Sequence, residues 1–132
     1  MTKLLTNHEV HRRARKLVLE TLTKRGEPAT LDGVRIKGCQ TRAPGRGWVC
    51  GLRDQNAPPG LEYFFVSLPT DGQEAEIYRL PSEVVAAWLQ KDHADWIARP
   101  GRHGQPHKDN PVRRLVNRDD WMRGYLVRDE AP

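Results

Sequence analysis

Arg35 and Lys37 are the residues whose type and spacing most directly suggest chemistry. In the segment 34–37, the apolar Val34 and Ile36 alternate with these two cations. A spacing of two places both basic side chains on the same face of a β-strand, where they could bind phosphate oxygens together. The alternative is an ordinary solvated strand face, since basic residues commonly protect the edge strands of a sheet from pairing with other chains.

A second set of polar residues lies in a later segment rich in glycine and proline. It offers imidazole and carboxylate groups that would suit a metal ion, although no pair of cysteines accompanies them: His93, His103, His107 and Asp109. We favour the alternative, in which the basic residues of this segment line a surface that meets phosphates or an acidic partner, or simply stay solvated. These residues are Arg102, His107, Lys108, Arg113 and Arg114.

The four tryptophans, Trp48, Trp88, Trp96 and Trp121, raise the possibility of stacking on nucleobases. The helical spacing of Trp88 and Trp96 favours core packing instead. The chain has no glycine-rich phosphate loop, no nucleophile elbow and no catalytic cysteine and histidine pattern. Kinase functions, and hydrolase functions of the serine or cysteine type, therefore have no support in the sequence.

Composition predicts one small, basic domain. The 132 residues include 22 Lys and Arg against 17 Asp and Glu, a formal net charge of +5, which favours polyanionic partners such as nucleic acid. We expect a single domain over 1–132, with an extended basic C-terminal segment from about residue 99. No stretch approaches the ~18 apolar residues of a membrane span, and no apolar run follows Met1, so we expect a cytoplasmic protein with no membrane contact. Cys39 and Cys50 are expected to be reduced.

The first predicted element is a helix that begins near Thr6. Thr6 and Glu9 have the spacing of a capping box, in which each side chain accepts a hydrogen bond from the backbone of the other residue. Gly26, followed by Pro28, predicts the end of this helix. Apolar residues recur between these limits at helical spacing: Val10, Ala14, Leu17, Val18 and Leu22.

The rest of the chain predicts strands, then a helix, then an extended tail. Segments 34–37 and 48–52 are expected to form a hairpin around Pro44 and Gly45, which would place Cys39 opposite Cys50. The remaining predictions are a loop at 54–60, a central strand at 61–68, a strand at 77–80, a helix from Pro81-Ser82, an extended segment at 99–111 and a short docking element at 121–127.

The order of these elements resembles that of bacterial PD-(D/E)xK nuclease-like proteins. The resemblance covers about Gly33 to Leu126 and rests on Val34-Arg35-Ile36-Lys37, Tyr63-Phe64-Phe65-Val66-Ser67-Leu68, the helix start at Pro81-Ser82 and the tail at 100–110. It implies a restriction-endonuclease-like α/β fold, in which a central mixed sheet of four to five strands is flanked by helices. In that family, carboxylates on two strands bind a divalent ion beside a lysine and activate water against a phosphodiester.

Carried onto this chain, the resemblance makes Lys37 the motif lysine, whereas Arg35 stands where the family has Glu, Asp or Gln. A guanidinium repels Mg²⁺. The resemblance therefore implies a nucleic-acid-binding protein, most simply for DNA, with impaired catalysis and no metal ligands that can be assigned. Its predicted contacts are Arg35, Lys37, Arg102, His107, Lys108, Arg113 and Arg114.

Two alternatives stay open. One is an active Mg²⁺-dependent endonuclease in which Lys37 acts with Asp32 or Glu27. The other is a protein-interaction module of a mobile-element or defence system, whose basic surface meets an acidic protein. Because nuclease-like proteins often dimerise to cut both strands, a homodimer is also open.

Overall fold

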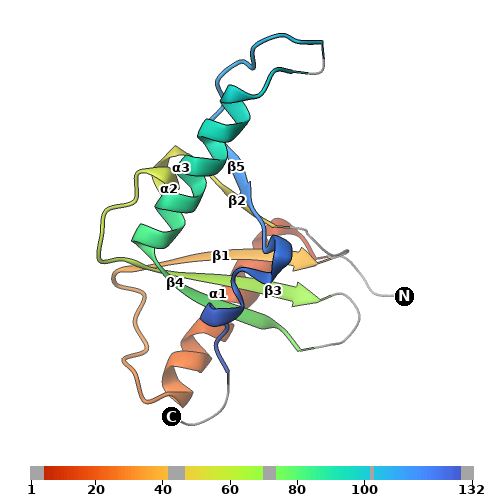
Figure 1. Cartoon of the computed structure of the whole chain (residues 1–132). Coiled ribbons are helices and arrows are strands. Elements are labelled where there is room, and N and C mark those ends of the chain that lie inside the picture. The colour runs from red at the N-terminus through yellow and green to blue at the C-terminus, as the bar shows by residue number, and fades with distance from the viewer. Residues whose placement is uncertain (1–4, 42–46, 70–73, 102, 129–132) are drawn as a thin grey trace.

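The computed structural model describes residues 5–41, 47–69, 74–101 and 103–128. It is a small α/β domain, as expected (Figure 1). The elements are α1 (Asn7–Lys24), β1 (Val34–Thr41), β2 (Trp48–Cys50), α2 (Leu52–Gln55), β3 (Glu62–Pro69), β4 (Glu76–Pro81), α3 (Ser82–Ala98), β5 (Arg113–Leu115) and two 3-10 helices, Arg118–Asp120 and Arg123–Tyr125. None of the helices in these ranges has the length and apolar character that crossing a membrane requires.

The strands form a three-stranded mixed sheet and a separate two-stranded sheet, in place of the single sheet of four to five strands that we expected. The order in the larger sheet is β1-β3-β4, with β1 parallel and β4 antiparallel to β3. β1 therefore lies at an edge. Its register places Arg35 beside Tyr63 and Lys37 beside Phe65, so both cations project from the same face of the sheet as these two aromatic residues.

The predicted hairpin between 34–37 and 48–52 is wrong. β2 pairs instead with β5, with Trp48 opposite Leu115, and β1 pairs with β3. Cys39 and Cys50 are consequently not cross-strand neighbours, and neither forms a disulfide. The predicted turn at Pro44 and Gly45 lies outside the described residues. Alternation identifies a strand but not its partner, and here each partner comes from a distant part of the chain.

Helix α1 covers one face of the sheet. Its capping box is confirmed, since the Thr6 hydroxyl accepts a hydrogen bond from the Glu9 N–H at 3.1 Å. The buried side of the helix packs against alternate residues of β3: Val10, Ala14, Val18 and Leu22 meet Phe64, Val66 and Leu68. Gly38 permits this close approach, because a Cβ there would lie 3.0 Å from the Ala14 Cβ.

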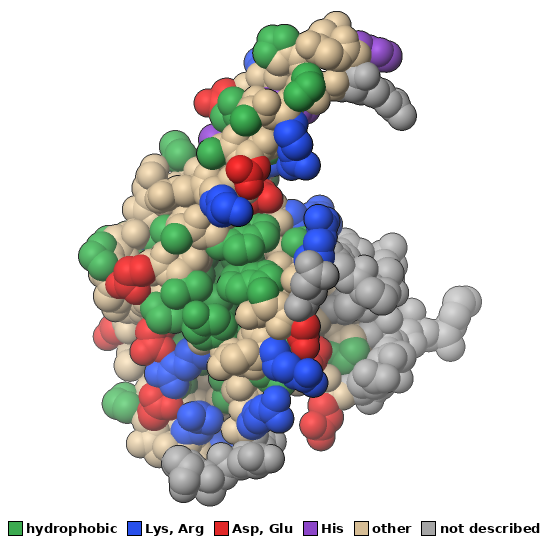
Figure 2. Space-filling model, in the orientation of Figure 1, with side chains coloured by type: hydrophobic (Ala, Val, Ile, Leu, Met, Phe, Trp, Pro, Cys, Tyr) green, Lys and Arg blue, Asp and Glu red, His purple; other side chains and the backbone are tan. Residues whose placement is uncertain are grey.

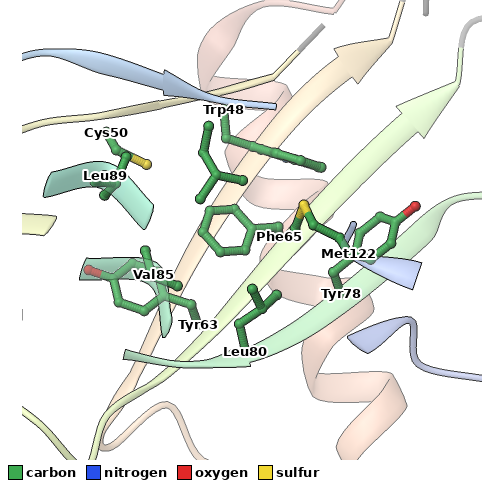
Figure 3. Close-up of a cluster of buried hydrophobic side chains, with 10 residues drawn as sticks. Trp48, Cys50, Tyr63, Phe65, Tyr78, Leu80, Val85, Leu89 and Met122 are labelled. Carbon is green, nitrogen blue, oxygen red and sulfur yellow. The ribbon is translucent and has the colours of Figure 1, made fainter. Parts of the chain in front are cut away.

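The opposite face carries the second part of the core (Figure 3). Tyr63 and Phe65 of β3 pack here against Val85 and Leu89 of α3, which confirms that β3 is the central strand with both faces buried. The remaining buried members come from β2, β4, β5 and the C-terminal segment: Trp48, Cys50, Tyr78, Leu80, Leu115 and Met122. The Trp48 indole N–H also donates to the Val66 carbonyl at 2.9 Å, which ties β2 to the sheet.

Helix α2 occupies a place where we predicted the end of a strand and a loop. The predicted strand 48–52 ends at Cys50. Asp54 then folds back, and its carboxylate accepts a hydrogen bond from the Gly51 N–H at 3.0 Å. This contact caps a single helical turn and buries Asp54 and Gln55 against the sheet and α3.

The environment of Cys50 predicts an unreactive thiol. Its side chain is fully buried, and burial, together with the nearby Asp54 carboxylate, raises its pKa to about 12. At pH 8, iodoacetamide is expected to modify Cys50 at least about 100-fold more slowly in the native protein than in urea, because the thiolate is the nucleophile. Peptide mass mapping measures both rates. Equal rates for native Cys50 and the half-buried Cys39 would contradict the prediction.

Candidate functional site

Arg35 and Lys37 converge on a buried carboxylate that the sequence did not single out, that of Asp54. Lys37 Nζ lies 3.0 Å from Asp54 Oδ2, and Arg35 Nη1 lies 3.7 Å from Oδ1. The Tyr63 hydroxyl donates to Oδ1 at 2.6 Å and accepts from Arg35 Nη1 at 2.8 Å. Arg35, Lys37, Asp54 and Tyr63 thus form a polar cluster that ties β1 to α2 and β3. The two cations are therefore not the ordinary solvated strand face of the alternative interpretation.

Asp54 is held in its charged form. Burial by itself would raise the pKa of this carboxyl, but hydrogen bonds from Tyr63, Lys37 and the Gly51 N–H outweigh burial and lower the pKa below its ordinary value of 3.8. Burial, together with the same carboxylate, raises the pKa of Tyr63, so its phenol remains a hydrogen-bond donor. The side chain of Asp54 is only 4% exposed, whereas that of Lys37 is 28% exposed and can also face a ligand.

Lys37 lies in a groove along the outer edge of β1, which we call the edge groove. Its volume is about 550 Å³, and its walls come from the start of α1, from β1 and from the β2–β5 pair. Its basic side chains are His11, Lys37 and Arg114, and no Asp or Glu of the described residues lines it. Gly47 lines the same groove, and the close approach of its backbone to β5 requires glycine, because a Cβ there would lie 2.0 Å from the Leu115 carbonyl oxygen.

A second groove, the tryptophan groove, adjoins β5 and has a volume of about 750 Å³. Its walls combine two aromatic rings with charged groups: Trp88, Trp121, Asp92, Arg113, Arg114 and Arg118. Val49 and Arg114, which face each other across the β2–β5 pair, line both grooves, so the grooves are neighbours. Figure 2 shows that the end of α3 projects from the body, with Lys and Arg side chains on both sides of the hollow between them.

The basic tail is only partly available for a ligand. His107 stacks on Trp96 with ring centroids 4.2 Å apart, and the Arg113 guanidinium lies 4.3 Å from the centroid of the same indole. These contacts fasten the extended segment to α3, as does the hydrogen bond between His93 and Asp109 (2.8 Å), and the Gln55 amide of α2 donates to the Pro111 carbonyl (2.7 Å). Lys108 and Arg114 are exposed. Arg102 lies outside the described residues.

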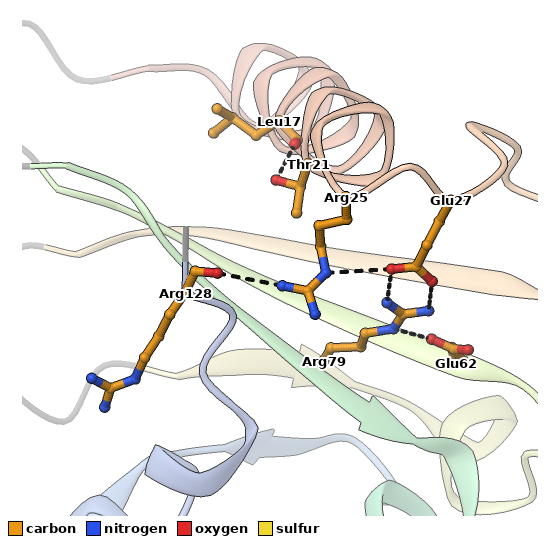
Figure 4. A network of polar contacts seen from close by, with 7 residues as sticks. All are labelled: Leu17, Thr21, Arg25, Glu27, Glu62, Arg79 and Arg128. Carbon is orange, nitrogen blue, oxygen red and sulfur yellow. Dashed lines mark hydrogen bonds and ion pairs between the residues drawn. The ribbon is translucent and has the colours of Figure 1, made fainter. Parts of the chain in front are cut away.

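Glu27 and Asp32, the carboxylates considered for catalysis, do not meet Lys37. Glu27 follows α1, and its carboxylate accepts hydrogen bonds from the Arg79 guanidinium at 2.7 and 2.8 Å, which lower its pKa (Figure 4). Arg79 is paired with Phe64 of β3, on the α1 face of the sheet, whereas Lys37 projects from the opposite face. Asp32 is exposed in the loop before β1.

The residues around Lys37 do not fit Mg²⁺. A magnesium site needs accessible oxygen ligands with near-octahedral geometry. Asp54 is the only carboxylate that is paired with Lys37 in the described ranges, and both of its oxygens already accept hydrogen bonds. The Arg35 cation lies beside the same carboxylate and would repel a metal ion. More widely, no group of three or more His, Cys, Asp and Glu residues suited to a metal ion occurs in the described part of the chain.

Comparison with protein-family models, curated proteins and solved structures finds no match to this chain. The nuclease-like resemblance therefore remains an expectation from the sequence.

Three contributors to the site were not predicted from the sequence. Asp54 carries one local signal, because an acid three residues after Gly51 has the spacing of a helix cap. Asp92 and Arg118 carry none, since exposed charges are common on helices and turns. Only the tertiary structure brings them together in the wall of the tryptophan groove.

Proposed function

We propose that this protein binds nucleic acid through the edge groove and the tryptophan groove, and that it does not cleave its ligand by a metal-dependent mechanism. The observation that carries the proposal is the position of Arg114, an exposed cation that lines both grooves. A phosphate backbone that passes over the two-stranded sheet would meet Lys37 on one side of Arg114 and Arg118 on the other. Cations that line two adjoining grooves suit a polyanion of this kind.

The electrostatics of the edge groove support this proposal. In the described part of the chain, no ion pair occupies Arg114, and the groove contains no carboxylate of its own. Lys37 is neutralised in part by Asp54, so its contribution to phosphate binding is weaker than that of Arg114. Arg35 is the more buried of the two cations, and it is also hydrogen bonded to Tyr63. We therefore assign Arg35 a structural role and Arg114 the central binding role.

The proposed absence of cleavage follows from the chemistry of the Lys37 cluster. Metal-dependent hydrolysis requires carboxylates that share a cation next to the scissile phosphate. Here one buried carboxylate serves as counter-ion to two basic side chains. The arrangement favours binding of an anion over binding of a cation, and this supports a nuclease-like protein that has lost its catalytic function.

A combined binding and cleavage assay tests the proposal. The protein is expected to slow the migration of short DNA in a gel. It should leave plasmid and single-stranded DNA intact in the presence of about 10 mM Mg²⁺ or Mn²⁺. Arg114→Ala should weaken the retardation. The active endonuclease would be established instead if the wild type makes metal-dependent cuts and Lys37→Arg does not. This variant keeps the positive charge beside Asp54. Failure to bind any nucleic acid at low salt would refute the proposal.

A further inference from the structure

We infer that the tryptophan groove accepts an unpaired nucleobase, so that the ligand is single-stranded nucleic acid. This inference rests on the proposed function and specifies its ligand. It comes from a feature that phosphate binding alone does not require, namely two tryptophan rings in the wall of a groove that also contains arginines.

The two rings are stacked on each other and present one preset aromatic surface to the groove. Trp88 and Trp121 lie 5.8 Å apart, with their planes only 8° from parallel. The Trp121 indole N–H donates to the Val116 carbonyl at 2.6 Å, which fixes the orientation of this ring. Both side chains are partly buried against the core, and both still line the groove. A base can stack on such a surface with little loss of side-chain entropy, because the rings are already ordered.

The polar groups of the groove complement a nucleotide. Asp92 offers carboxylate oxygens that can accept hydrogen bonds from the amino group of a base. Arg118 and Arg114 offer cations for the flanking phosphates, while Arg113 is engaged with Trp96. The groove volume of about 750 Å³ lies within the range of known small-ligand sites.

The same features select single strands over duplexes. In a duplex the base faces are stacked and the amino groups are paired, so a duplex can offer its phosphates to Arg114 but not a base to Trp88 and Trp121. An acidic peptide would satisfy the arginines but would leave the tryptophan surface and Asp92 without complementary groups. Single-stranded nucleic acid satisfies all three.

Three oligonucleotides of the same length, which differ in their bases or in strandedness, test the inference with the unaltered protein. The probes are a single-stranded deoxycytidine oligonucleotide, an abasic oligonucleotide of the same length and charge, and a duplex of that length. We expect the deoxycytidine strand to bind about tenfold more tightly than the abasic strand and to quench tryptophan fluorescence, which the abasic strand should not do. Trp48 lies in the buried core, and Trp96 is in contact with His107 and the Arg113 guanidinium, so quenching would report mainly on Trp88 and Trp121 of the groove.

A matched pair of variants distinguishes this inference from the proposed function. Trp88→Leu, which removes one ring of the tryptophan groove and no charge, should weaken binding of the single strand and leave duplex binding unchanged. Arg114→Ala should weaken both. Equal affinity for the base-bearing and abasic strands, without quenching, would overturn the inference and leave the proposed function intact. Failure to bind any of the three probes would overturn both.

Discussion

Replacing Asp54 with alanine is expected to lower the free energy of unfolding by about 3 to 5 kcal/mol, the usual effect of removing one partner of a buried ion pair. The variant leaves the Lys37 ammonium and the Tyr63 hydroxyl without their acceptor, and it removes the contact that caps α2. Urea denaturation followed by circular dichroism measures the change.

Asp95→Ala is the matched control. Asp95 also pairs with a lysine, Lys91, at 3.8 Å, but its side chain is 60% exposed. Exposed pairs of this kind contribute about 0.3 to 0.5 kcal/mol. A loss for Asp54→Ala as small as that of the control would show that the cluster does not stabilise the fold. Lys37→Met combined with Asp54→Ala should recover part of the lost stability, because the double variant contains no unpaired ammonium.

The stabilisation by Asp54 should depend on pH with a definite sign. Its folded-state pKa lies below the ordinary value of 3.8, because the hydrogen bonds to the carboxylate outweigh burial. Its contribution is therefore fully present above about pH 4 and is lost as the pH falls through the lowered folded-state pKa. The difference in stability between wild type and Asp54→Ala should stay constant from pH 7 to pH 5 and shrink on further acidification. A difference that grows at acid pH would contradict this assignment.

Reversing the charge of Arg114 is expected to have the largest effect on binding. Arg114→Glu places a carboxylate where the two grooves meet, and should weaken binding of single-stranded DNA by at least about tenfold at low salt. Arg114 is exposed on β5, so the change should alter the free energy of unfolding by less than about 0.5 kcal/mol. Fluorescence anisotropy of a labelled oligonucleotide measures the affinity.

Arg13→Glu makes the same change in net charge at an exposed position of α1 that lines neither groove. It should reduce affinity only slightly, through the general charge of the protein. Arg114→Ala should also reduce the slope of log K against log salt by about 0.7, the value for one phosphate contact on a single strand. Equal losses for Arg13→Glu and Arg114→Glu would mean that binding is a property of net charge and not of the grooves.

Local patterns in the sequence predicted three main elements correctly. The capping box at Thr6 and Glu9 located the start of α1, and the helical spacing after Pro81-Ser82 predicted α3. The unbroken apolar run 63–66 predicted that β3 is central and buried on both faces. Each of these signals depends on neighbours within a few residues, so it can be recognised without knowledge of the tertiary fold.

Strand pairing and the surroundings of Lys37 were not predictable in this way. Chain proximity suggested that β1 pairs with β2, but β1 lies parallel to β3 and β2 joins β5. The same bias directed attention to Glu27 and Asp32 as partners for Lys37. Glu27 is nearer in sequence, but it lies across the sheet, whereas Asp54 reaches Lys37 through the turn of α2.

The alternating residues of β1 were sufficient to place Arg35 and Lys37 on one face, because the geometry of a strand repeats every two residues whatever surrounds it. The same local rules predicted a small basic α/β domain. The counter-ion of Lys37, the grooves around Arg114 and the parallel rings of Trp88 and Trp121 depend instead on which distant segments pack together. That choice is made by burial of the whole core, to which every element contributes, and no short stretch of sequence records it.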